Sequence, residues 1–173
     1  SFATKITSLS SDSMKRLQLL LLWVWMVCFS AASHDYMFKH LEVKDGLSNN
    51  QVNAIYKDSN GFMWFGTASG LNRYDGYNIK IYRSQKDDEK SLPDSYVEDI
   101  QEDASGNLWI RTGSGYAIYN SASDVFDRNV EAWMWNIGLT GNHSLIYIDK
   151  EKTFWIYING KGVYSYREEQ KNA

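Results

Sequence analysis

Hydrophobic and polar positions form two different patterns along the chain. Near the amino terminus, residues 17–29 (LQLLLLWVWMVCF) form one apolar run without a polar face. From about residue 47 onward, short apolar segments of five to seven residues are separated by turns rich in Gly, Asn, Asp and Ser. The long run predicts a helix, and the short segments predict β-strands joined by tight turns.

The apolar run has the flanks of a secretory signal peptide. Met14, Lys15 and Arg16 precede it, and the small residues 30–33 (SAAS) follow it. A run of 13 residues is short of the roughly 20 that a membrane-spanning helix needs. We therefore predict a signal peptide over 14–33, cleaved after Ala32 or Ser33, and an exported chain. Residues 1–13 are expected to be unstructured upstream sequence.

Two other interpretations of this segment are weaker. A lipoprotein would be modified at Cys28, but Val27 stands where a lipobox requires a small residue. A buried core helix fits poorly because the run has no polar face. Since Cys28 is the one cysteine of the chain, the sequence excludes an internal disulfide and a CxxC metal site.

An internal repeat of about 45 residues organises the remainder of the chain. Trp64, Trp109 and Trp155 follow one another at intervals of 45 and 46 residues. Other residue types recur at fixed distances from each tryptophan, with one residue inserted in the third copy. They are isoleucines (Ile55, Ile100, Ile146), aspartates (Asp58, Asp103, Asp149), glycines before the tryptophan (Gly61 and Gly106, with Lys152 in the third copy) and glycines after it (Gly70, Gly115, Gly162).

Each repeat divides into short strands. In the first, the segments 52–58, 62–68, 71–75 and 77–83 are separated by turn sequences such as Ser-Asn-Gly and Asp-Gly. Four short strands in a repeat of this length are typical of a β-propeller blade. The sequence therefore predicts an all-β fold with about three four-stranded antiparallel blades, an incomplete propeller preceded by a signal-peptide helix. The propeller part would cover 34–173, with repeats at about 47–91, 92–137 and 138–173.

The recurrence of tryptophan and aspartate favours structural roles for both. A ligand meets a protein at one place, whereas packing is needed in every blade, so each repeat tryptophan is expected to bury its ring against the next blade. Each repeat aspartate is expected to hold the following turn through backbone hydrogen bonds. Sugar stacking by the tryptophans and catalysis by the aspartates are the less favoured alternatives.

Charge and composition exclude several classes of function. The net charge of −3, from 18 basic and 21 acidic residues, argues against nucleic-acid binding driven by counterion release. GxSxG, HExxH and Walker-type sequences are absent. The three histidines, His34, His40 and His143, are isolated in sequence, so neither a metal site nor a cofactor is expected.

One stretch resembles a known family closely. The run D-x-x-G-x-x-W-x-G-T-x-x-G-L-x-R-Y-D is present at 58–75 without a mismatch, and residues 47–77 as a whole resemble the two-component regulator propeller repeat. The second copy, 103–119, keeps the frame but has Arg111 in place of a glycine and lacks the Arg-Tyr-Asp. The third copy is looser still.

The resemblance implies a function for the propeller. Such repeats build the periplasmic sensor of Bacteroidetes hybrid two-component systems, which binds glycan-derived oligosaccharides and regulates polysaccharide-utilisation genes. Further blades, a membrane helix, kinase and receiver modules and a DNA-binding domain would complete the receptor, which would act as a homodimer. This segment itself is expected to be neither an enzyme nor in contact with nucleic acid.

Departures from the repeat mark candidate ligand-binding residues. Arg111 and Tyr157 occupy the position held by Gly66 in the first copy, where the consensus would leave room for a side chain. Trp133 and Trp135 lie outside both the repeat position and the signal peptide. Aromatic rings beside an arginine suit an acidic or neutral oligosaccharide. The favoured alternative is that these residues fill an irregular blade edge, and contact with a partner subunit also remains open.

Two other functions remain open. One is a free-standing carbohydrate- or protein-binding propeller that acts as a scaffold. The other is a propeller enzyme acting on glycans, since Asp-x-x-Gly-x-x-Trp also resembles the Asp-box of sialidases. A sialidase needs an arginine cluster and a tyrosine–acid pair, and the sequence alone does not bring these together.

The repeat count leads to a stability prediction. Residues 33–173 contain 141 residues, which is three repeats of about 45, whereas closed propellers generally use four to eight blades. Two aromatic blade faces would then have nothing to pack on. We expect isolated residues 33–173 to aggregate, to oligomerise or to unfold without cooperativity, as measured by analytical ultracentrifugation and a thermal melt. A sharp two-state melt from a monomer would contradict this.

Overall fold

The computed structural model describes residues 13–23, 37–141 and 143–168, and only the backbone of His143 and Ser144. It divides the chain into two units, 1–40 and 41–173. In the first unit, residues 13–23 form a helix with exposed side chains. Within the described residues, no helix is both long and apolar enough to cross a membrane. Cys28 and the predicted cleavage site lie outside the described residues, so the signal peptide remains a prediction.

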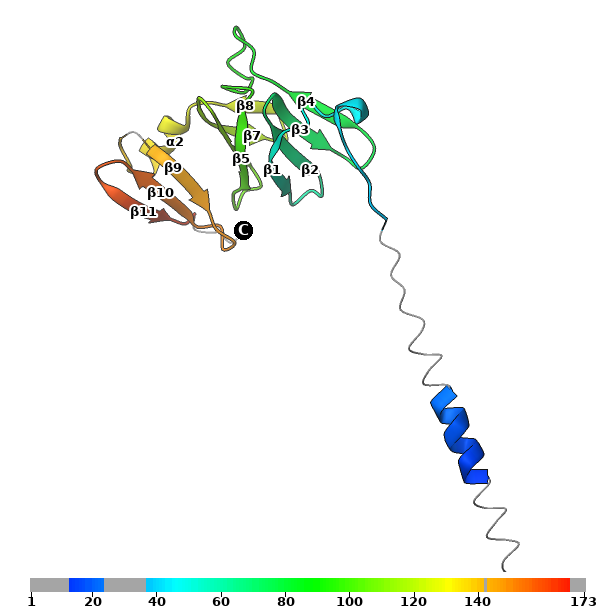
Figure 1. Cartoon of the computed structure of the whole chain (residues 1–173). Coiled ribbons are helices and arrows are strands. Elements are labelled where there is room, and N and C mark those ends of the chain that lie inside the picture. Colours follow the sequence, from blue (N-terminus) through cyan, green and yellow to red (C-terminus); the bar gives the residue numbers. More distant parts are fainter. Residues whose placement is uncertain (1–12, 24–36, 142, 169–173) are drawn as a thin grey trace, which may run out of the picture. The chain divides into compact units, whose positions relative to one another are not determined.

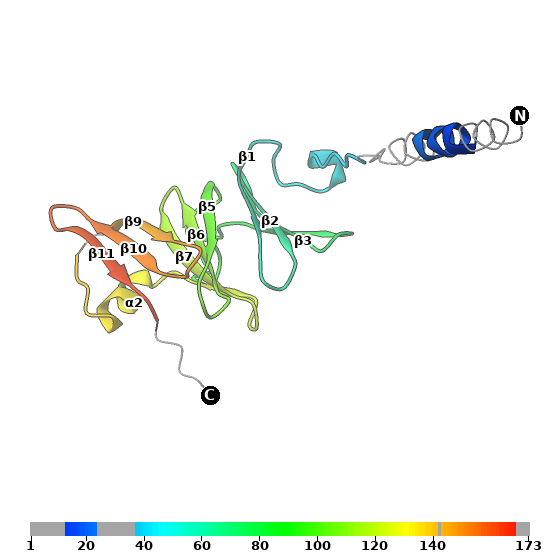
Figure 2. The ribbon, with the colours of Figure 1, turned by 90° about the horizontal axis from the view of Figure 1, so that it is seen from below.

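The second unit consists of three antiparallel sheets that lie side by side (Figures 1 and 2). The first sheet contains β1 (Val52–Lys57), β2 (Met63–Thr67), β3 (Gly70–Tyr74) and β4 (Ile79–Tyr82). The second contains β5 (Val97–Glu102), β6 (Leu108–Thr112), β7 (Gly115–Asn120) and β8 (Val125–Asp127). The third contains β9 (His143–Ile148), β10 (Phe154–Ile158) and β11 (Gly162–Tyr166). A short 3-10 helix, η1 (Val43–Asp45), precedes β1.

The predicted blade topology is confirmed, with one difference in the third sheet. Strands that follow one another in sequence are neighbours in each sheet, in the order β1-β2-β3-β4 and β5-β6-β7-β8. Within the described residues the third sheet has three strands, one fewer than predicted. The first strand of each sheet (β1, β5 or β9) lies at one edge of that sheet, and the first strands of neighbouring sheets contact one another. We call these three strands the inner strands.

Strand β6 shows why the sheets stack. Its residues alternate between two faces, and both faces are covered, which explains its nearly continuous apolar sequence. Leu108 and Ile110 belong to a core shared with the first sheet. Trp109 belongs to a second core that includes Phe154 and Ile156 of the third sheet. The second sheet is therefore the middle layer between two hydrophobic interfaces.

A helix that the sequence analysis did not predict connects the second and third sheets. Helix α2 (Val130–Asn136) begins after Asn129, whose side chain accepts a hydrogen bond from the backbone N–H of Ala132. Val130 and Met134 are four residues apart, and both are buried in the second core. With only seven residues, the helix depends on this packing for its stability.

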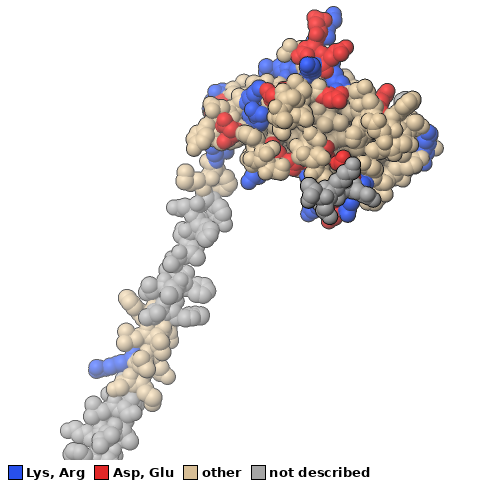
Figure 3. All heavy atoms as spheres, turned by 180° about the vertical axis from the view of Figure 1, so that it is seen from behind, with Lys and Arg blue, Asp and Glu red and all other residues tan. Residues whose placement is uncertain are grey.

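The loop between β4 and β5 projects from the sheets, and its Lys, Asp and Glu side chains form a charged knob (Figures 1 and 3). Arg128 holds the base of this loop. Its guanidinium donates hydrogen bonds to the backbone carbonyls of Asp88 (2.9 Å), Ser91 (2.8 Å) and Leu92 (2.8 Å). The chain is thereby fixed just before it enters β5.

One carboxylate in each sheet ties a turn to a tryptophan. In the first sheet, Asp58 Oδ1 accepts from the backbone N–H of Phe62 (2.8 Å), and Asp58 Oδ2 accepts from Trp64 Nε1 (2.7 Å). Asp103 and Trp109 repeat the indole bond at 3.0 Å. The six-residue spacing between aspartate and tryptophan is therefore the length of one turn plus the start of a strand.

The third copy of this aspartate–tryptophan pair differs from the others in burial. Trp155 Nε1 donates to Asp149 Oδ2 at 2.8 Å, as in the other sheets. However, the exposed fraction of Trp155 is 43%, against 1% for Trp64 and 2% for Trp109. Trp64 packs on Tyr119 of the second sheet, and Trp109 packs on Phe154 of the third. The bond is thus local to each sheet, whereas burial of the ring requires a neighbouring sheet.

Glu102 links all three sheets at the end of β5. Its carboxylate accepts hydrogen bonds from the backbone N–H (3.0 Å) and hydroxyl (2.6 Å) of Ser59, which belongs to the first sheet's turn. Lys152, from the turn between β9 and β10, donates to the backbone carbonyl of Glu102 (2.9 Å) and lies 3.4 Å from its carboxylate. Since the Glu102 side chain is only 5% exposed, these donors replace the water that burial removes.

Lys152 also explains a break in the repeat. Gly61 and Gly106 hold the equivalent position with φ of +91° and +79°, and Lys152 adopts φ of +62°. For a residue with a side chain this left-handed conformation costs about 1–2 kcal/mol. The contacts of the Lys152 ammonium with Glu102 offset that cost. In the third repeat the turn therefore has a strained lysine in place of the glycine, and this lysine bonds the turn to the second sheet.

Replacement of a repeat tryptophan tests the importance of ring burial. In the complete sensor domain, Trp109→Phe removes a buried hydrogen bond to a carboxylate and is expected to lower the free energy of unfolding by about 2–3 kcal/mol. Trp135→Phe is the control, because Trp135 is 73% exposed on α2, outside the repeat position, and should cost less than about 1 kcal/mol. Urea denaturation measures both, and equal losses would contradict this account.

A second prediction concerns the pH dependence of stability. Burial raises the pKa of Glu102, but the hydrogen bonds from Ser59 and the charge of Lys152 outweigh it and lower this pKa below its ordinary value. The stabilisation is therefore complete above the unfolded-state pKa of about 4.3 and is lost as the pH falls through the lower folded-state pKa. We expect Glu102→Gln to reduce the acid dependence of the urea midpoint between neutral pH and about pH 3.

The matched control for this measurement is Glu151→Gln. Glu151 is exposed and lies in the same turn as Lys152. Its replacement should leave the acid limb of the stability profile unchanged. An identical acid limb for the wild-type and Glu102→Gln proteins would show that Glu102 does not couple protonation to folding.

Candidate ligand-binding site

The amino-terminal end of β5 meets the turn between β6 and β7. We call residues 94–99 and 111–114 the rim of the second sheet. Asp94 builds it: its Oδ1 accepts from the backbone N–H of Tyr96 (3.0 Å), and its Oδ2 accepts from the hydroxyl of Ser114 (3.0 Å). The backbone N–H of Gly113 donates to the carbonyl of Tyr96 at 2.9 Å. The chain entering β5 and the β6–β7 turn are thus held as one surface.

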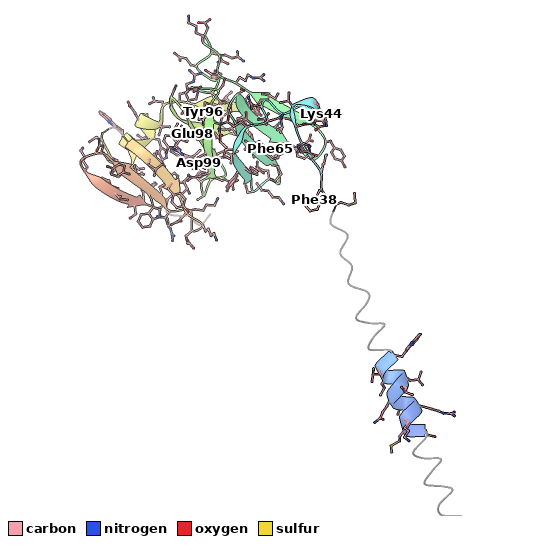
Figure 4. The ribbon with its side chains drawn as sticks, in the orientation of Figure 1. Phe38, Lys44, Phe65, Tyr96, Glu98 and Asp99 are labelled. Atoms are coloured by element: carbon pink, nitrogen blue, oxygen red, sulfur yellow. The ribbon has the colours of Figure 1, made fainter. Side chains whose placement is uncertain are left out.

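A β-bulge in β5 shapes the rim. Val97 pairs with Thr112 and Asp99 pairs with Arg111, so Glu98 is an extra residue without a partner across the strands. Glu98 Oε2 instead lies 2.9 Å from Arg111 Nη1. Figure 4 shows Tyr96, Glu98 and Asp99 along β5, with Tyr96 on the side of the projecting loop. The bulge therefore turns a carboxylate toward the arginine.

The rim combines an exposed ring with charged groups. Tyr96 is 40% exposed, and the Glu98 and Arg111 side chains are each 34% exposed. The backbone N–H of Tyr96 lowers the pKa of Asp94 below its ordinary value, with a smaller contribution from the hydroxyl of Ser114. Among the described atoms, Arg111 Nε is buried and has no hydrogen-bond acceptor. An exposed ring, carboxylates and a partly exposed guanidinium suit a ligand rich in hydroxyl groups.

The position of Gly66, Arg111 and Tyr157 in the repeat lies on the face that each sheet turns toward the next. The glycine of the repeat consensus was expected to leave room for a side chain at this position, and for the first sheet this expectation is wrong. A Cβ added to Gly66 would lie 2.6 Å from Val97 Cγ1, because the second sheet approaches the first at this point. Arg111 holds the position beside Glu98, and Tyr157 lies on β10 with 41% of its surface exposed.

The two candidate tryptophans lie in different surroundings. Trp133 packs against Trp109 and Phe154, with ring centroids 4.6 and 4.8 Å away, and against Tyr166 at 5.8 Å. It therefore fills the interface between the second and third sheets. Trp135 is 73% exposed on α2. The structure thus places Arg111 in the rim and Trp133 in a core, and does not gather the four candidates around one point.

Sequence reasoning missed most of the rim. Asp94, Tyr96, Glu98 and Asp99 were not among its candidates, although each stands 45 residues after a neutral residue of the first repeat. The signal was therefore present in the aligned repeats. That signal is the replacement of neutral residues in the first repeat by an aromatic residue and carboxylates in the second.

The structure also assembles a tyrosine–acid pair that the sequence did not reveal. The hydroxyls of Tyr82 and Tyr119 each lie 2.7 Å from Asp124 Oδ1, and Lys80 binds the other carboxylate oxygen. Arg73 Nη1 donates to the Tyr119 hydroxyl at 3.1 Å. The cluster connects β3 and β4 of the first sheet with β7 and the turn before β8.

The protonation of this cluster opposes a catalytic role. Burial raises the pKa of Asp124, but the hydrogen bonds from Lys80, Tyr82 and Tyr119 prevail and lower it to about 2. Burial raises the pKa of both tyrosines. A phenol becomes a nucleophile only when it loses its proton, which this arrangement makes harder. In the described part of the chain, His, Cys, Asp and Glu side chains form no group that could hold a metal ion.

The stacked antiparallel sheets and their repeated aspartate–tryptophan pairs identify the described sheets as blades of β-propeller type. The two-component regulator propeller family matches residues 46–69 and 91–114, so the chain carries two-component regulator propeller repeats. The resemblance inferred from the sequence is confirmed.

Individual proteins show the same relationship. Histidine kinase P4 of Formosa agariphila is 38% identical over 66 residues, which are 38% of this chain and 5% of that protein. The extracellular domain of the hybrid two-component system BT3049 from B. thetaiotaomicron has a TM-score of 0.57 at 26% identity, over 77% of this chain and 19% of that domain. The corresponding domain of BT4673 from the same organism has a TM-score of 0.52 at 26% identity, with the same shares of the two chains.

The chain therefore resembles a small part of much larger receptors. Its matched region spans 5% of the length of Histidine kinase P4 and 19% of the solved extracellular domains. These comparisons support the class of sensor-domain propellers for the described sheets.

Proposed function

We propose that the chain forms blades of the periplasmic sensor of a hybrid two-component system, and that the sensor binds glycan-derived oligosaccharides. The proposal rests on one observation: two-component regulator propeller repeats present the rim of the second sheet, with the exposed ring of Tyr96 beside the partly exposed Glu98–Arg111 ion pair, to solvent. The extracellular location of the BT3049 and BT4673 domains supports the placement outside the cytoplasm.

In this proposal the rim would work by two kinds of contact. The ring of Tyr96 would lie against the apolar face of a sugar, and Asp94, Glu98 and Arg111 would exchange hydrogen bonds with its hydroxyl groups. A ligand changes the output of a receptor only if it binds two signalling states with different affinity. Further blades and a second receptor subunit would supply those states, and the output would be the expression of polysaccharide-utilisation genes.

Calorimetric titration of the complete sensor domain with oligosaccharides tests the site. We expect Tyr96→Ala and Arg111→Ala each to weaken binding by about tenfold or more, because both remove groups central to the contact. Tyr77→Ala is the matched control, since Tyr77 is 92% exposed in the turn between β3 and β4, at the opposite end of the strands. Unchanged affinity in both rim variants would remove the rim from the site.

The same titration decides the place of the other candidates. Loss of affinity in Trp135→Ala would extend the site onto α2, as the sequence-based hypothesis expects. Unchanged affinity would restrict the site to the rim. Tyr157→Ala reports in the same way on the third sheet.

A further inference from the structure

The first and second sheets build their rims with the same backbone. In the first sheet, Asn49 Oδ1 accepts from the backbone N–H of Gln51 (2.7 Å), and Asn49 Nδ2 donates to the Ser69 hydroxyl (3.0 Å). Asp94 makes the equivalent bonds with Tyr96 and Ser114, both at 3.0 Å. The first sheet also has a bulge, since Val52 pairs with Thr67 and Ala54 with Gly66.

The side chains on these two equal frameworks differ in charge. Four positions are neutral in the first sheet and carry three carboxylates and a tyrosine in the second. The pairs are Asn49 and Asp94, Gln51 and Tyr96, Asn53 and Glu98, and Ala54 and Asp99. Because Asn49 holds its turn without a charge, the fold of the rim does not require the charge of Asp94. The carboxylates of the second rim therefore call for an explanation other than folding.

Arg111 compensates only one of the three carboxylates. It pairs with Glu98, whereas the hydrogen bonds of the other two come from neutral groups. Asp94 accepts from a backbone N–H and a serine hydroxyl. Asp99 accepts from the backbone N–H of Ile100 (2.9 Å) and the side-chain amide of Gln101 (2.6 Å). The rim is thus left with an excess of negative charge.

We infer that the rim of the second sheet selects a neutral, hydroxyl-rich oligosaccharide and disfavours oligosaccharides that carry uronate or sulfate groups. This inference rests on the proposed function and narrows it. Sugar hydroxyls donate hydrogen bonds to carboxylates, and the guanidinium of Arg111, whose side chain is 34% exposed, can donate to a hydroxyl oxygen. An anionic substituent would instead meet Asp94 and Asp99 and be repelled. The carboxylates that the fold does not need thereby make the site selective against anionic ligands.

The test compares neutral and uronate-containing oligosaccharides of matched length in calorimetric titrations of the complete sensor domain. We expect the best neutral ligand to bind about tenfold or more tightly than the best uronate ligand. The affinity for the neutral ligand should change little between low and high salt. Its stacking on Tyr96 and its hydroxyl hydrogen bonds do not depend on a net charge of the ligand.

A transplanted rim provides the decisive variant. The triple variant Asp94→Asn, Glu98→Asn, Asp99→Ala gives the second sheet the residues of the first, and leaves Arg111 without its carboxylate. We expect the preference for neutral over uronate ligands to fall at least about tenfold. Asp94→Asn alone is the conservative variant, since asparagine already makes the same bonds at residue 49, and should lower the preference in the same direction. Asn49→Asp in the first rim is the reciprocal control for added charge.

The outcomes separate the inference from the proposed function. Failure of every neutral and every uronate oligosaccharide to bind would count against the function itself. Uronate ligands binding as tightly as neutral ones, or tighter, would overturn the inference while the sensor function stands. A neutral preference that survives both the triple variant and Asp94→Asn would also overturn it, because the selectivity would then reside elsewhere.

Discussion

The hydrogen bond from a tryptophan indole to an aspartate carboxylate is the interaction on which the architecture depends. In each sheet the aspartate closes the turn before the second strand and fixes the direction of the indole ring. The ring then projects from the sheet at one place and in one orientation. Where a neighbouring sheet is present, that ring becomes the centre of the interface, as Trp64 and Trp109 show. A local bond within about one turn of chain thus determines how sheets distant in sequence meet.

The side chains at the two ends of the inner strands differ in how freely they can be substituted. At one end, the aspartate turns recur in every sheet, and Glu102 joins the first and third sheets through Ser59 and Lys152. Changes there alter the packing of several sheets together. At the rim, the backbone is held by short-range bonds that Asn49 and Asp94 make equally well. Side chains at the rim can therefore change from neutral to charged without altering the framework, which is what a recognition surface requires.

Much of the fold could be predicted from the sequence, and the reasons are local. The spacing of Trp64 and Trp109, the turn glycines and the short apolar segments each reflect interactions within one repeat, and the strands lie where these patterns place them. Helix α2 could not be recognised in this way. It lies outside the repeat and owes its stability to the burial of Val130 and Met134 against other sheets. The link between Lys152 and Glu102 escaped for the same reason, since 50 residues separate the partners.

The candidate site shows this division most clearly. By itself, the sequence determined that Arg111 departs from the consensus and that three repeated sheets stack through their tryptophans. Only the tertiary structure decided that Arg111 lies beside Glu98 in a rim with Tyr96, and that Trp133 belongs to a core. The physical reason is the range of the interactions. Hydrogen bonds within a turn are encoded by neighbouring residues, whereas a bulge, an ion pair or a ring buried between sheets depends on where separate strands meet.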